Sequence, residues 1–346
     1  MDFQLNEEQK MLKRMVRDVA EREFHSKVAE WEALGEWFPD EYTKKLADLG
    51  LLGLALPVKY GGQGRTAFES ILAIEELARV WPACAWPAFE SNVGPIRVIE
   101  QFGTESQKQR YIPPVCRGES WVAAGMTEPE AGSALTDLST RAVLDGKYYV
   151  VNGTKRFISG GGKADAYVVY VKLSEQRGAR GIGGLIIEKG TPGFSFGKQE
   201  QFMGFRGIPS CDLIFDDCRV PKENLVTKEG EFRKLMTAFD LERCGNATIC
   251  LGIAQGALEE AIAYSQQRKQ WGKDICEFQA IQFMLADMAV KVEAARLLIY
   301  KATANAAMGL PSLLEANLAK YFANEMVKDV TVLALQIYGG YGYSKD

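Results

Sequence analysis

The sequence predicts a multidomain protein of helices and strands: an N-terminal all-α domain, a central antiparallel β domain and a C-terminal helical bundle. Three observations indicate this. Apolar residues recur at helical spacing up to about residue 115, short strand-like runs fill about 120–226, and long apolar stretches without proline follow. At roughly 150 residues a domain, 346 residues suffice for such an arrangement. The expected domains are 1–118, 119–228 and 229–346.

Helix-start and helix-stop signals define the N-terminal region. Asn6 is followed three residues later by Gln9, a pattern that resembles a capping box, and apolar residues then recur at helical spacing. This predicts a first helix. A second is expected over 40–49, where Gly50 can end it in a left-handed conformation, and a third begins near Phe68. The glycine-rich residues 57–64 predict a turn between them.

The central region contains a hairpin signal. Residues 141–144 and 147–151 are strand-like and are separated by Asp145 and Gly146, a pair that accepts the positive φ angles of tight hairpin turns. Further strands are expected at 166–171, 184–187 and 213–215. Because no helical pattern interrupts these strands, they favour an antiparallel barrel or sandwich over a parallel sheet.

The C-terminal region predicts long helices over 231–268, 277–309 and 312–338. A helix of ~30 residues extends about 45 Å at 1.5 Å per residue, which is typical of a helical bundle.

The composition of the sequence indicates which classes of binding partner to expect. The net charge is −4 with both signs interleaved, so the basic surface of a nucleic-acid-binding protein is not expected, and a small-molecule substrate is. The N-terminus does not resemble a signal peptide, and no apolar run approaches the ~20 residues of a membrane span. Seven cysteines without a C-x-x-C pair are typical of reduced thiols. We therefore expect a cytoplasmic protein that acts away from membranes.

The single histidine, His25, limits the chemistry. A Ser/His/Asp triad, a Cys/His dyad or a multi-histidine metal site is not expected, and no metal site is predicted. Neither G-x-G-x-x-G between a strand and a helix nor the P-loop pattern G-x-x-x-x-G-K-S/T occurs. Acid and base chemistry must then come from carboxylates, lysine or tyrosine.

Glu242 is the most informative carboxylate. Leu235, Phe239, Glu242, Asn246 and Ile249 follow one another at spacings of three and four, so Glu242 interrupts a largely apolar helical stripe. Two interpretations stay open at this point. The carboxylate is paired with an arginine, or desolvation raises its pKa toward the range of a general base.

Several ordered motifs then show a resemblance that covers essentially the whole chain. Residues 126–133 (M-T-E-P-E-A-G-S) resemble T-E-P-x-A-G-S, and 157–159 (F-I-S) stand in place of W-I-S/T. Residues 203–221 contain M-G-F-R and F-D-D-C-R-V-P, while 267–272 and 336–342 read Q-R-K-Q-W-G and Q-I-Y-G-G-Y-G. Together they resemble the acyl-CoA dehydrogenases, flavoenzymes that introduce an α,β double bond into acyl-CoA thioesters.

The resemblance implies FAD as the cofactor and assigns its contacts. Residues along the flavin or the thioester would be Met126, Thr127, Ser133, Phe157 and Ser159. Residues reaching the FAD of a neighbouring subunit would be Arg268, Gln279, Gln336, Gly339 and Gly340. Substrate-binding residues would be Ser133, Asp240, Arg243 and Glu90. Such sharing implies a homo-oligomer, usually a tetramer.

The resemblance also implies the reaction: a glutamate takes the α-proton while the β-hydride moves to flavin N5. The family's commoner base belongs to a C-terminal E-G-T/S motif that would fall after Asp346. A minority of members, the isovaleryl and long-chain types, use the glutamate of a D-x-E-R segment, which here is Glu242. We therefore expect Glu242 as the catalytic base and electron-transferring flavoprotein as the electron acceptor.

Alternatives on the same scaffold are an acyl-CoA oxidase, an enoyl-CoA reductase, or an oligomeric scaffold member without catalysis. A branched, cyclic or aryl-bearing acyl chain is expected, but the sequence does not identify it. The sequence also leaves open whether Glu242 or a carboxylate beyond Asp346 is the base. The physiological direction, the electron acceptor and the roles of Glu130 and Glu90 are likewise left open.

Overall fold

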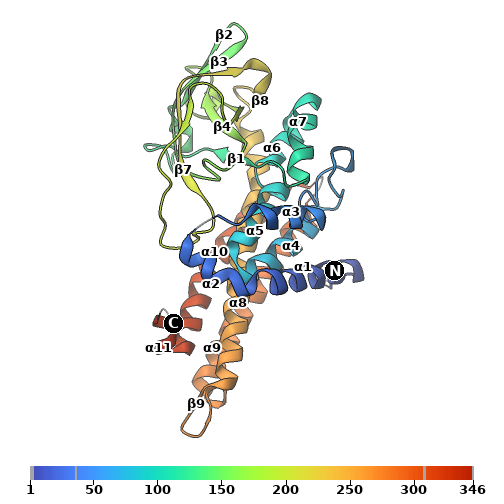
Figure 1. Ribbon diagram of the computed structural model, residues 1–346, viewed down its shortest axis with the longest axis vertical. Helices are drawn as coiled ribbons and strands as arrows, with labels where there is room; N and C mark the ends of the chain where they lie inside the picture. Colours follow the sequence, from blue (N-terminus) through green and yellow to red (C-terminus); the bar gives the residue numbers. More distant parts are fainter. Residues whose placement is uncertain (1–3, 36, 307–308, 345–346) are drawn as a thin grey trace. The chain divides into compact units, whose positions relative to one another are not determined.

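The computed structural model describes residues 4–35, 37–306 and 309–344 (Figure 1). Contacts between Cα atoms divide the chain into two compact units. The first unit consists of described residues within 1–28, 71–85 and 243–346, and the second of those within 29–70 and 86–242. This division follows packing and not chain order, so the domain boundaries at 118 and 228 stay a prediction.

The first unit is helical apart from a short hairpin. Its helices come from α1 (Glu7–Glu23), the ends of α4 (Ala67–Val80) and α8 (Phe232–Gln267), the start of α5 (Pro82–Asn92), α9 (Gln279–Ala304), α10 (Leu313–Tyr338) and α11 (Gly340–Tyr343). The hairpin pairs β9 (Lys269–Gln270) with β10 (Lys273–Asp274). The capping box is confirmed: Gln9 N–H donates to Asn6 Oδ1 at 2.9 Å, and Asn6 N–H donates to Gln9 Oε1 at 3.1 Å.

Two glycines let α8 approach α4 closely within this unit. A Cβ atom on Gly252 would lie 2.6 Å from Ala78 Cβ, and one on Gly256 would lie 2.4 Å from the Arg79 carbonyl oxygen. Side chains larger than hydrogen would therefore separate the helices.

Buried ionic groups join four helices of the first unit. Glu75 on α4 is 2% exposed and accepts hydrogen bonds from Lys13 Nζ at 3.0 Å, Arg296 Nε at 3.1 Å and the Tyr300 hydroxyl at 2.6 Å. Glu76 pairs in the same way with Arg17 of α1, and Arg79 with Glu259 of α8. Burial alone would raise the pKa of Glu75, but the charges of Lys13 and Arg296 hold it below its usual value.

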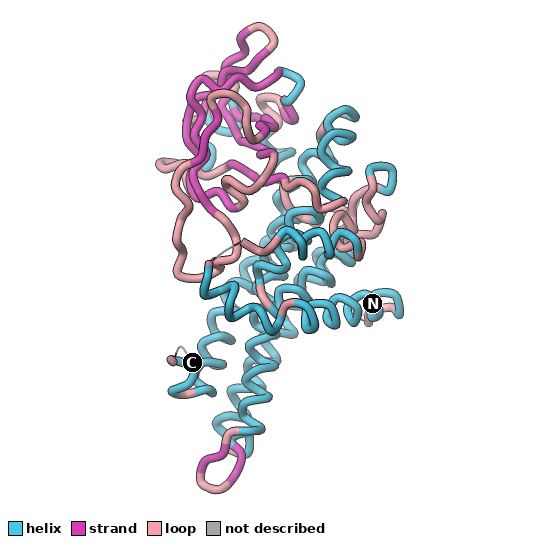
Figure 2. The backbone as a smooth tube through the Cα atoms, viewed as in Figure 1, coloured by secondary structure: helices cyan, strands magenta, loops and turns pink. Residues whose placement is uncertain are grey.

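The second unit contains the sheet (Figure 2). Its helices are α2 (Val28–Leu34), α3 (Asp40–Asp48), α6 (Ile96–Phe102), α7 (Glu105–Cys116), and parts of α4, α5 and α8. Its strands are β1 (Val122–Gly125), β2 (Arg141–Asp145), β3 (Tyr148–Ser159), β4 (Ala166–Lys172), β5 (Ile182–Glu188), β6 (Phe194–Phe196), β7 (Ser210–Pro221) and β8 (Leu225–Thr227).

The strands form one sheet in the order β6-β7-β3-β2-β4-β5-β8, with β1 also paired to β4. Most pairs are antiparallel, and β1–β4 and β2–β4 are parallel. The hairpin signal is confirmed, because Asp145 pairs with Tyr148 across Gly146 at a φ of 60°. The expected combination of an N-terminal helical region, a mostly antiparallel sheet and a C-terminal helical region is therefore correct.

Strand alternation places two cores on opposite faces of the sheet. Val168 and Tyr170 of β4 pack in one core with α6, α7 and the start of α8. Tyr167, Val169 and Val171 pack in the other, with residues of β3 and β7. The first core fixes Leu235 and Ala238, and so it positions the first turns of α8 in this unit.

In the described part of the chain, no helix combines the length and apolar character that crossing a membrane requires. Within these same residues no cluster of His, Cys, Asp and Glu could hold a metal ion.

We predict that Glu75→Gln lowers the free energy of unfolding by about 2–4 kcal/mol, because it removes the buried negative charge that the half-buried cations Lys13 and Arg296 both contact. The pKa of Glu75 is depressed in the folded state, so its stabilisation is present above the usual carboxyl pKa of about 4.3 and is lost as the pH falls. Urea unfolding followed by circular dichroism at pH 7 and pH 4 measures both effects. The variant should lose less stability between these pH values than the wild type.

The control is Glu325→Gln, which removes an exposed carboxylate paired with Lys328. Exposed pairs contribute about 0–1 kcal/mol, so this variant should unfold like the wild type. Equal destabilisation by both substitutions would contradict the assigned role of Glu75.

Candidate functional site

A bulge in β3 turns an aromatic ring outward in the second unit. The pairing of β3 with β7 shifts register between Lys155 and Ile158, and Phe157 within this shift has a φ of 55°. Its ring is 51% exposed, and the guanidinium of Arg156 lies 4.4 Å from the ring centre. Bulges are common beside active sites because they change the direction of a side chain. Here the bulge leaves the Phe157 ring partly exposed to solvent.

The loop after β1 is hydrogen-bonded to the same part of β3. Lys155 Nζ donates to the Met126 carbonyl oxygen at 3.1 Å and to Glu128 Oε1 at 2.8 Å. One residue further along each segment, Arg156 N–H donates to the Thr127 carbonyl oxygen at 2.8 Å. These bonds fix Met126 and Thr127 relative to the bulge that carries the exposed ring.

The carboxylate of Glu128 is almost fully buried and has several donors. Besides Lys155, it accepts from Ser139 N–H at 2.6 Å and from Thr140 N–H at 2.9 Å. Burial would raise the pKa of Glu128, but Lys155 and these hydrogen bonds lower it to about 2. Burial lowers the pKa of Lys155 to about 8 despite the opposing effect of Glu128, so both groups are charged at neutral pH.

The donors around the exposed ring suit a flat heterocycle with oxygen and nitrogen at its edge. Among the described residues, the backbone N–H group of Thr127, next to this bulge, donates to no backbone or side-chain acceptor. Ser159 lies half-buried two residues after Phe157. An aromatic face with nearby free donors is what an isoalloxazine ring requires, so the residues fit a flavin.

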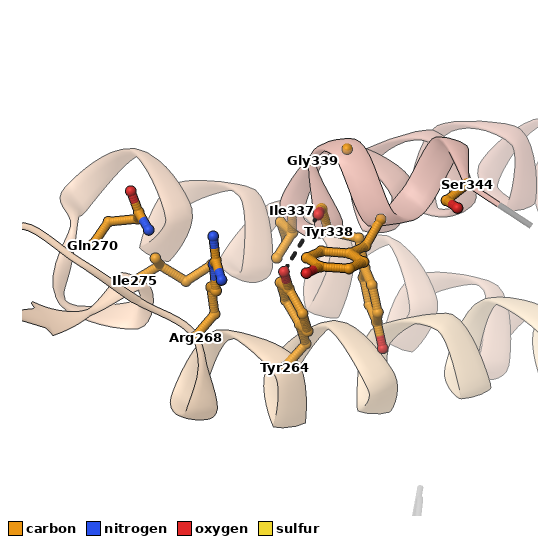
Figure 3. Close-up of a pocket in the computed structure, with 10 residues that line it drawn as sticks. Tyr264, Arg268, Gln270, Ile275, Ile337, Tyr338, Gly339 and Ser344 are labelled. Atoms are coloured by element: carbon orange, nitrogen blue, oxygen red, sulfur yellow. Dashed lines mark hydrogen bonds between the residues drawn. The ribbon is translucent and has the colours of Figure 1, made fainter. Parts of the chain in front are cut away.

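A separate pocket of about 470 Å³ opens in the first unit (Figure 3). It is lined by Tyr264, Arg268, Gln270, Ile275, Ile337, Tyr338, Gly339, Gly340, Tyr341 and Ser344. The rings of Tyr264 and Tyr338 stack with centres 4.2 Å apart, and Arg268 lies between Tyr264 and Ile275 in the view.

The guanidinium of Arg268 is exposed and makes no ion pair with a carboxylate of the described residues. Its charge lies 5.9 Å from the centre of the Tyr341 ring. A free guanidinium in an open pocket suits a phosphate or pyrophosphate, which it can bind through two parallel hydrogen bonds.

Two carboxyl groups influence each other in the second unit. Glu90 of α5 is 8% exposed, and burial followed by the negative charge of Glu242 raises its pKa well above the usual value. Glu242 is half-buried on α8, and Asp240 is 5% exposed two residues before it. Two carboxyl groups of this unit therefore interact, and burial together with the charge of Glu242 favours the protonated form of Glu90.

The expected apolar stripe around Glu242 needs a correction. Leu235 and Ile249 are buried, but Phe239 is half-buried and Asn246 is exposed. The buried face of α8 contains instead Ala238 and Leu241, which each precede a residue of the expected stripe, Phe239 and Glu242, by one position. Glu242 thus lies at the margin of the buried face and not in its middle.

Comparisons with known proteins match all three parts of the chain to one family. Residues 6–119, 123–218 and 232–346 match the acyl-CoA dehydrogenase N-terminal, middle and C-terminal domains. The chain is 42% identical to the short-chain specific acyl-CoA dehydrogenase of Clostridium acetobutylicum, covering 100% of this chain and 91% of that protein. It is also 42% identical to acryloyl-CoA reductase (NADH) of Anaerotignum propionicum, covering 100% and 88%. The chain belongs to the acyl-CoA dehydrogenase family.

Solved structures of the family have the same fold. Butyryl-CoA dehydrogenase of Megasphaera elsdenii superposes with a TM-score of 0.96 at 39% identity, over 100% of this chain and 91% of that one. A chain in a structure named for the electron transferring flavoprotein of Acidaminococcus fermentans gives 0.96 at 44%, over the same shares. A glutaryl-CoA dehydrogenase of Mycobacterium smegmatis, with a TM-score of 0.91 at 26% identity over 98% and 86%, was solved in complex with FADH2. The expectation of an acyl-CoA dehydrogenase is confirmed at the level of the family, which is flavin-dependent.

The structure brings some of the expected site residues of this acyl-CoA dehydrogenase family member together. Met126, Thr127, Phe157 and Ser159 belong to the joined loop and bulge, while Ser133 lies exposed at the far end of the loop. Arg268, Gly339 and Gly340 line one pocket. Gln279 and Gln336 are exposed on α9 and α10 outside its lining. Arg243 belongs to the first unit, whereas Asp240, Glu242 and Glu90 belong to the second.

Sequence reasoning missed the Lys155–Glu128 ion pair. A signal was present, because Val151, Gly153 and Lys155 alternate along β3 on one face, which places a lysine at an inward position. A buried lysine requires a partner, and Glu128 of the T-E-P motif was an available carboxylate.

We predict that Lys155→Met leaves a buried carboxylate without its cation, loosens the loop and lowers both stability and flavin content. The free energy of unfolding should fall by about 3 kcal/mol. Flavin absorbance per mole of purified protein measures the second effect. Because the pKa of Glu128 is depressed in the fold, wild-type stability from this pair is lost as the pH falls from about 4.3 toward about 2.

Lys147→Met is the matched control, since Lys147 is exposed in the β2–β3 hairpin turn. It should retain wild-type flavin content. Full flavin content in Lys155→Met would show that the Lys155–Glu128 ion pair is not needed to hold the loop after β1 in its flavin-binding position.

Proposed function

We propose that this protein is an FAD-dependent acyl-CoA dehydrogenase in which the Glu242 carboxylate removes the α-proton of an acyl-CoA thioester. The observation that supports the proposal is the interacting pair of carboxyl groups, of which Glu90 is buried and has a raised pKa, in a chain of this family. When bound, the flavin would accept the β-hydrogen with its electron pair. The remaining roles belong to side chains of the chain itself.

Met126, Thr127 and Phe157 would hold the isoalloxazine ring of the flavin. The Lys155–Glu128 ion pair fixes the loop that carries Met126 and Thr127 against the β3 bulge that carries Phe157. Two neighbouring carboxyl groups do not both ionise readily, so a neutral Glu90 permits Glu242 to be the ionised member. An ionised carboxylate at a half-buried position can accept a proton from the α-carbon.

The test uses anaerobic mixing of the flavin-loaded protein with a panel of acyl-CoA thioesters, followed at the flavin absorption band. Wild-type protein should bleach with at least one thioester. Glu242→Gln should keep its flavin and lose the bleaching by a factor of about 100 or more, since general-base catalysis contributes 10²–10⁴-fold.

Glu229→Gln is the control, because Glu229 is exposed three residues before α8 begins. It should bleach like the wild type. Unchanged bleaching in Glu242→Gln would transfer the role of base to another carboxylate, and absence of flavin from purified protein would refute the proposed cofactor.

A second candidate is the reverse reaction, favoured by the 42% identity to acryloyl-CoA reductase (NADH). The same residues would serve, with protonated Glu242 donating to the α-carbon. Two rates are compared: oxidation of the dithionite-reduced flavin by an enoyl-CoA, and reduction of the oxidised flavin by the corresponding saturated acyl-CoA. A faster first rate would support the reductase direction. A faster second rate would support the dehydrogenase direction.

Electron-transferring flavoprotein is proposed as the electron acceptor, supported by the similar chain in the structure named for such a flavoprotein. A homotetramer is proposed from exposed apolar side chains on α9 and α10. Phe283, Val290, Leu314, Tyr321 and Val332 are each 61–71% exposed. In this arrangement Arg268 would bind the FAD pyrophosphate of a neighbouring subunit, together with Gly339 and Gly340, with Gln279 and Gln336 close by.

We predict that Val290→Asp combined with Val332→Asp dissociates the oligomer, because each places a charge where apolar contact is proposed. Light scattering after size-exclusion chromatography should give a smaller mass and a lower flavin content. Val58→Asp, which changes a 70% exposed valine of the second unit, should preserve the wild-type mass. A monomeric wild-type protein, or an unchanged mass in the double variant, would contradict this assembly.

A further inference from the structure

The bulge in β3 places two residues, Arg156 and Phe157, opposite one residue of β7, Asp212. This follows from the register shift between Lys155 and Ile158, which adds an extra residue to β3. Phe157 has a φ of 55°, a region that side chains other than glycine rarely adopt. Such a conformation persists only where the surrounding contacts hold it, so the contacts of the bulge decide how Phe157 is presented.

Arg156 joins the segments that meet around the Phe157 ring. Its Nη1 donates to Asp212 Oδ2 on β7 at 2.6 Å, and its Nη2 lies 3.2 Å from Glu200 Oε1 in the loop between β6 and β7. Its backbone N–H donates to the Thr127 carbonyl oxygen in the loop after β1 at 2.8 Å. One arginine therefore ties the bulge to three other segments of the second unit.

The guanidinium also covers part of the aromatic ring. It lies over the Phe157 ring at 4.4 Å from the ring centre, and the ring remains 51% exposed. Phe202, two residues after Glu200, has its ring centre 6.4 Å from that of Phe157. A planar guanidinium stacks on an aromatic face, which the ammonium group of a lysine cannot do in the same way. Arg156 thus holds the ring from one side and leaves the remaining surface for a ligand.

Two carboxylates near this ring depend on Arg156 for their cation. Among the described residues, neither Asp212 nor Glu200 has another cation within ion-pair distance. Asp212 Oδ1 is buried and has no hydrogen-bond partner in this part of the chain. The two negative charges also act on their surroundings, because burial followed by the charges of Asp212 and Glu200 raises the pKa of Cys211 to about 11. Without Arg156, both charges would be left uncompensated beside the ring.

We propose that Arg156 is a positioning residue for the flavin: it holds Phe157 against the ring and neutralises Asp212 and Glu200, and it thereby raises the midpoint potential of the bound cofactor. This inference rests on the proposed function, because it requires FAD beside Phe157. Reduction adds electrons to the ring, so uncompensated negative charge nearby disfavours the reduced form.

The experiment measures two properties of FAD that do not depend on turnover. The Kd comes from titration of the apoprotein with FAD, followed by flavin fluorescence, and the midpoint potential comes from equilibration of the bound flavin with a reference dye. Arg156→Met should weaken FAD binding about tenfold, because the contact that holds Phe157 is lost. It should also shift the two-electron reduction about tenfold toward the oxidised form, which lowers the potential by about 30 mV.

Two further variants separate charge from packing. Asp212→Asn removes a negative charge, so it should move the potential upward, opposite to Arg156→Met. A general loosening of the site would move the potential in the same direction in both variants. Arg156→Lys keeps the charge and lacks the planar group, so it should keep a potential near that of the wild type and raise the Kd several-fold. Asp212→Asn and Arg156→Lys keep the test valid if Arg156→Met fails to fold.

Arg219→Met is the matched control. Arg219 also belongs to β7, where it lies over the Tyr148 ring at 5.1 Å and pairs with Asp145 at 3.1 Å. The substitution therefore removes the same kinds of contact at the hairpin end of β2 and β3, away from the bulge. Both the FAD Kd and the midpoint potential should equal those of the wild type.

A wild-type potential or a wild-type Kd in Arg156→Met would overturn the inference and leave the proposed function intact. A shift of the potential in the same direction in Arg156→Met and Asp212→Asn would overturn it as well. The expected shifts in a protein whose flavin no thioester bleaches would support this inference and refute the proposed dehydrogenase activity. Failure of the wild-type apoprotein to bind FAD would overturn both.

Discussion

A carboxylate removed from water must gain a cation, gain hydrogen-bond donors or become protonated, and this constraint organises both units. Glu75 satisfies it with Lys13 and Arg296, and it thereby ties α4 to α1 and α9. Glu128 satisfies it with Lys155 and backbone donors. Burial and the charge of Glu242 raise the pKa of Glu90, which favours its protonated form. The paired groups stabilise the fold, and Glu90 belongs to the candidate site.

A register shift between β3 and β7 positions the aromatic ring of the candidate site. Regular pairing of β3 with β7 would alternate the side chains of Arg156, Phe157 and Ile158 between the two faces. The register shift before Ile158 allows Ile158 to stay buried while Phe157 turns out to solvent. Lys155, directly before the shift, anchors the loop that follows β1. One buried ion pair therefore aligns the two segments that would contact the flavin, and the packed sheet around them keeps this alignment rigid.

The proposed proton removal is assigned to the second unit, where Glu242 and Glu90 interact. Burial is the largest influence on the pKa of Glu90, so this interaction depends on the packing of α5 and the first turns of α8. A pocket with a free guanidinium and exposed apolar helices in the first unit is consistent with cofactor sharing between copies.

Much of the molecule followed from the sequence by itself. The capping box at Asn6, the Asp145-Gly146 hairpin and the long α8 were predictable, because they depend on local turn chemistry and hydrophobic periodicity. The ordered motifs indicated the family and the flavin. Only the tertiary structure paired Lys155 with Glu128, put Glu90 beside Glu242 and left Trp86 without a partner. These depend on desolvation and on contacts between distant segments, which no local spacing encodes.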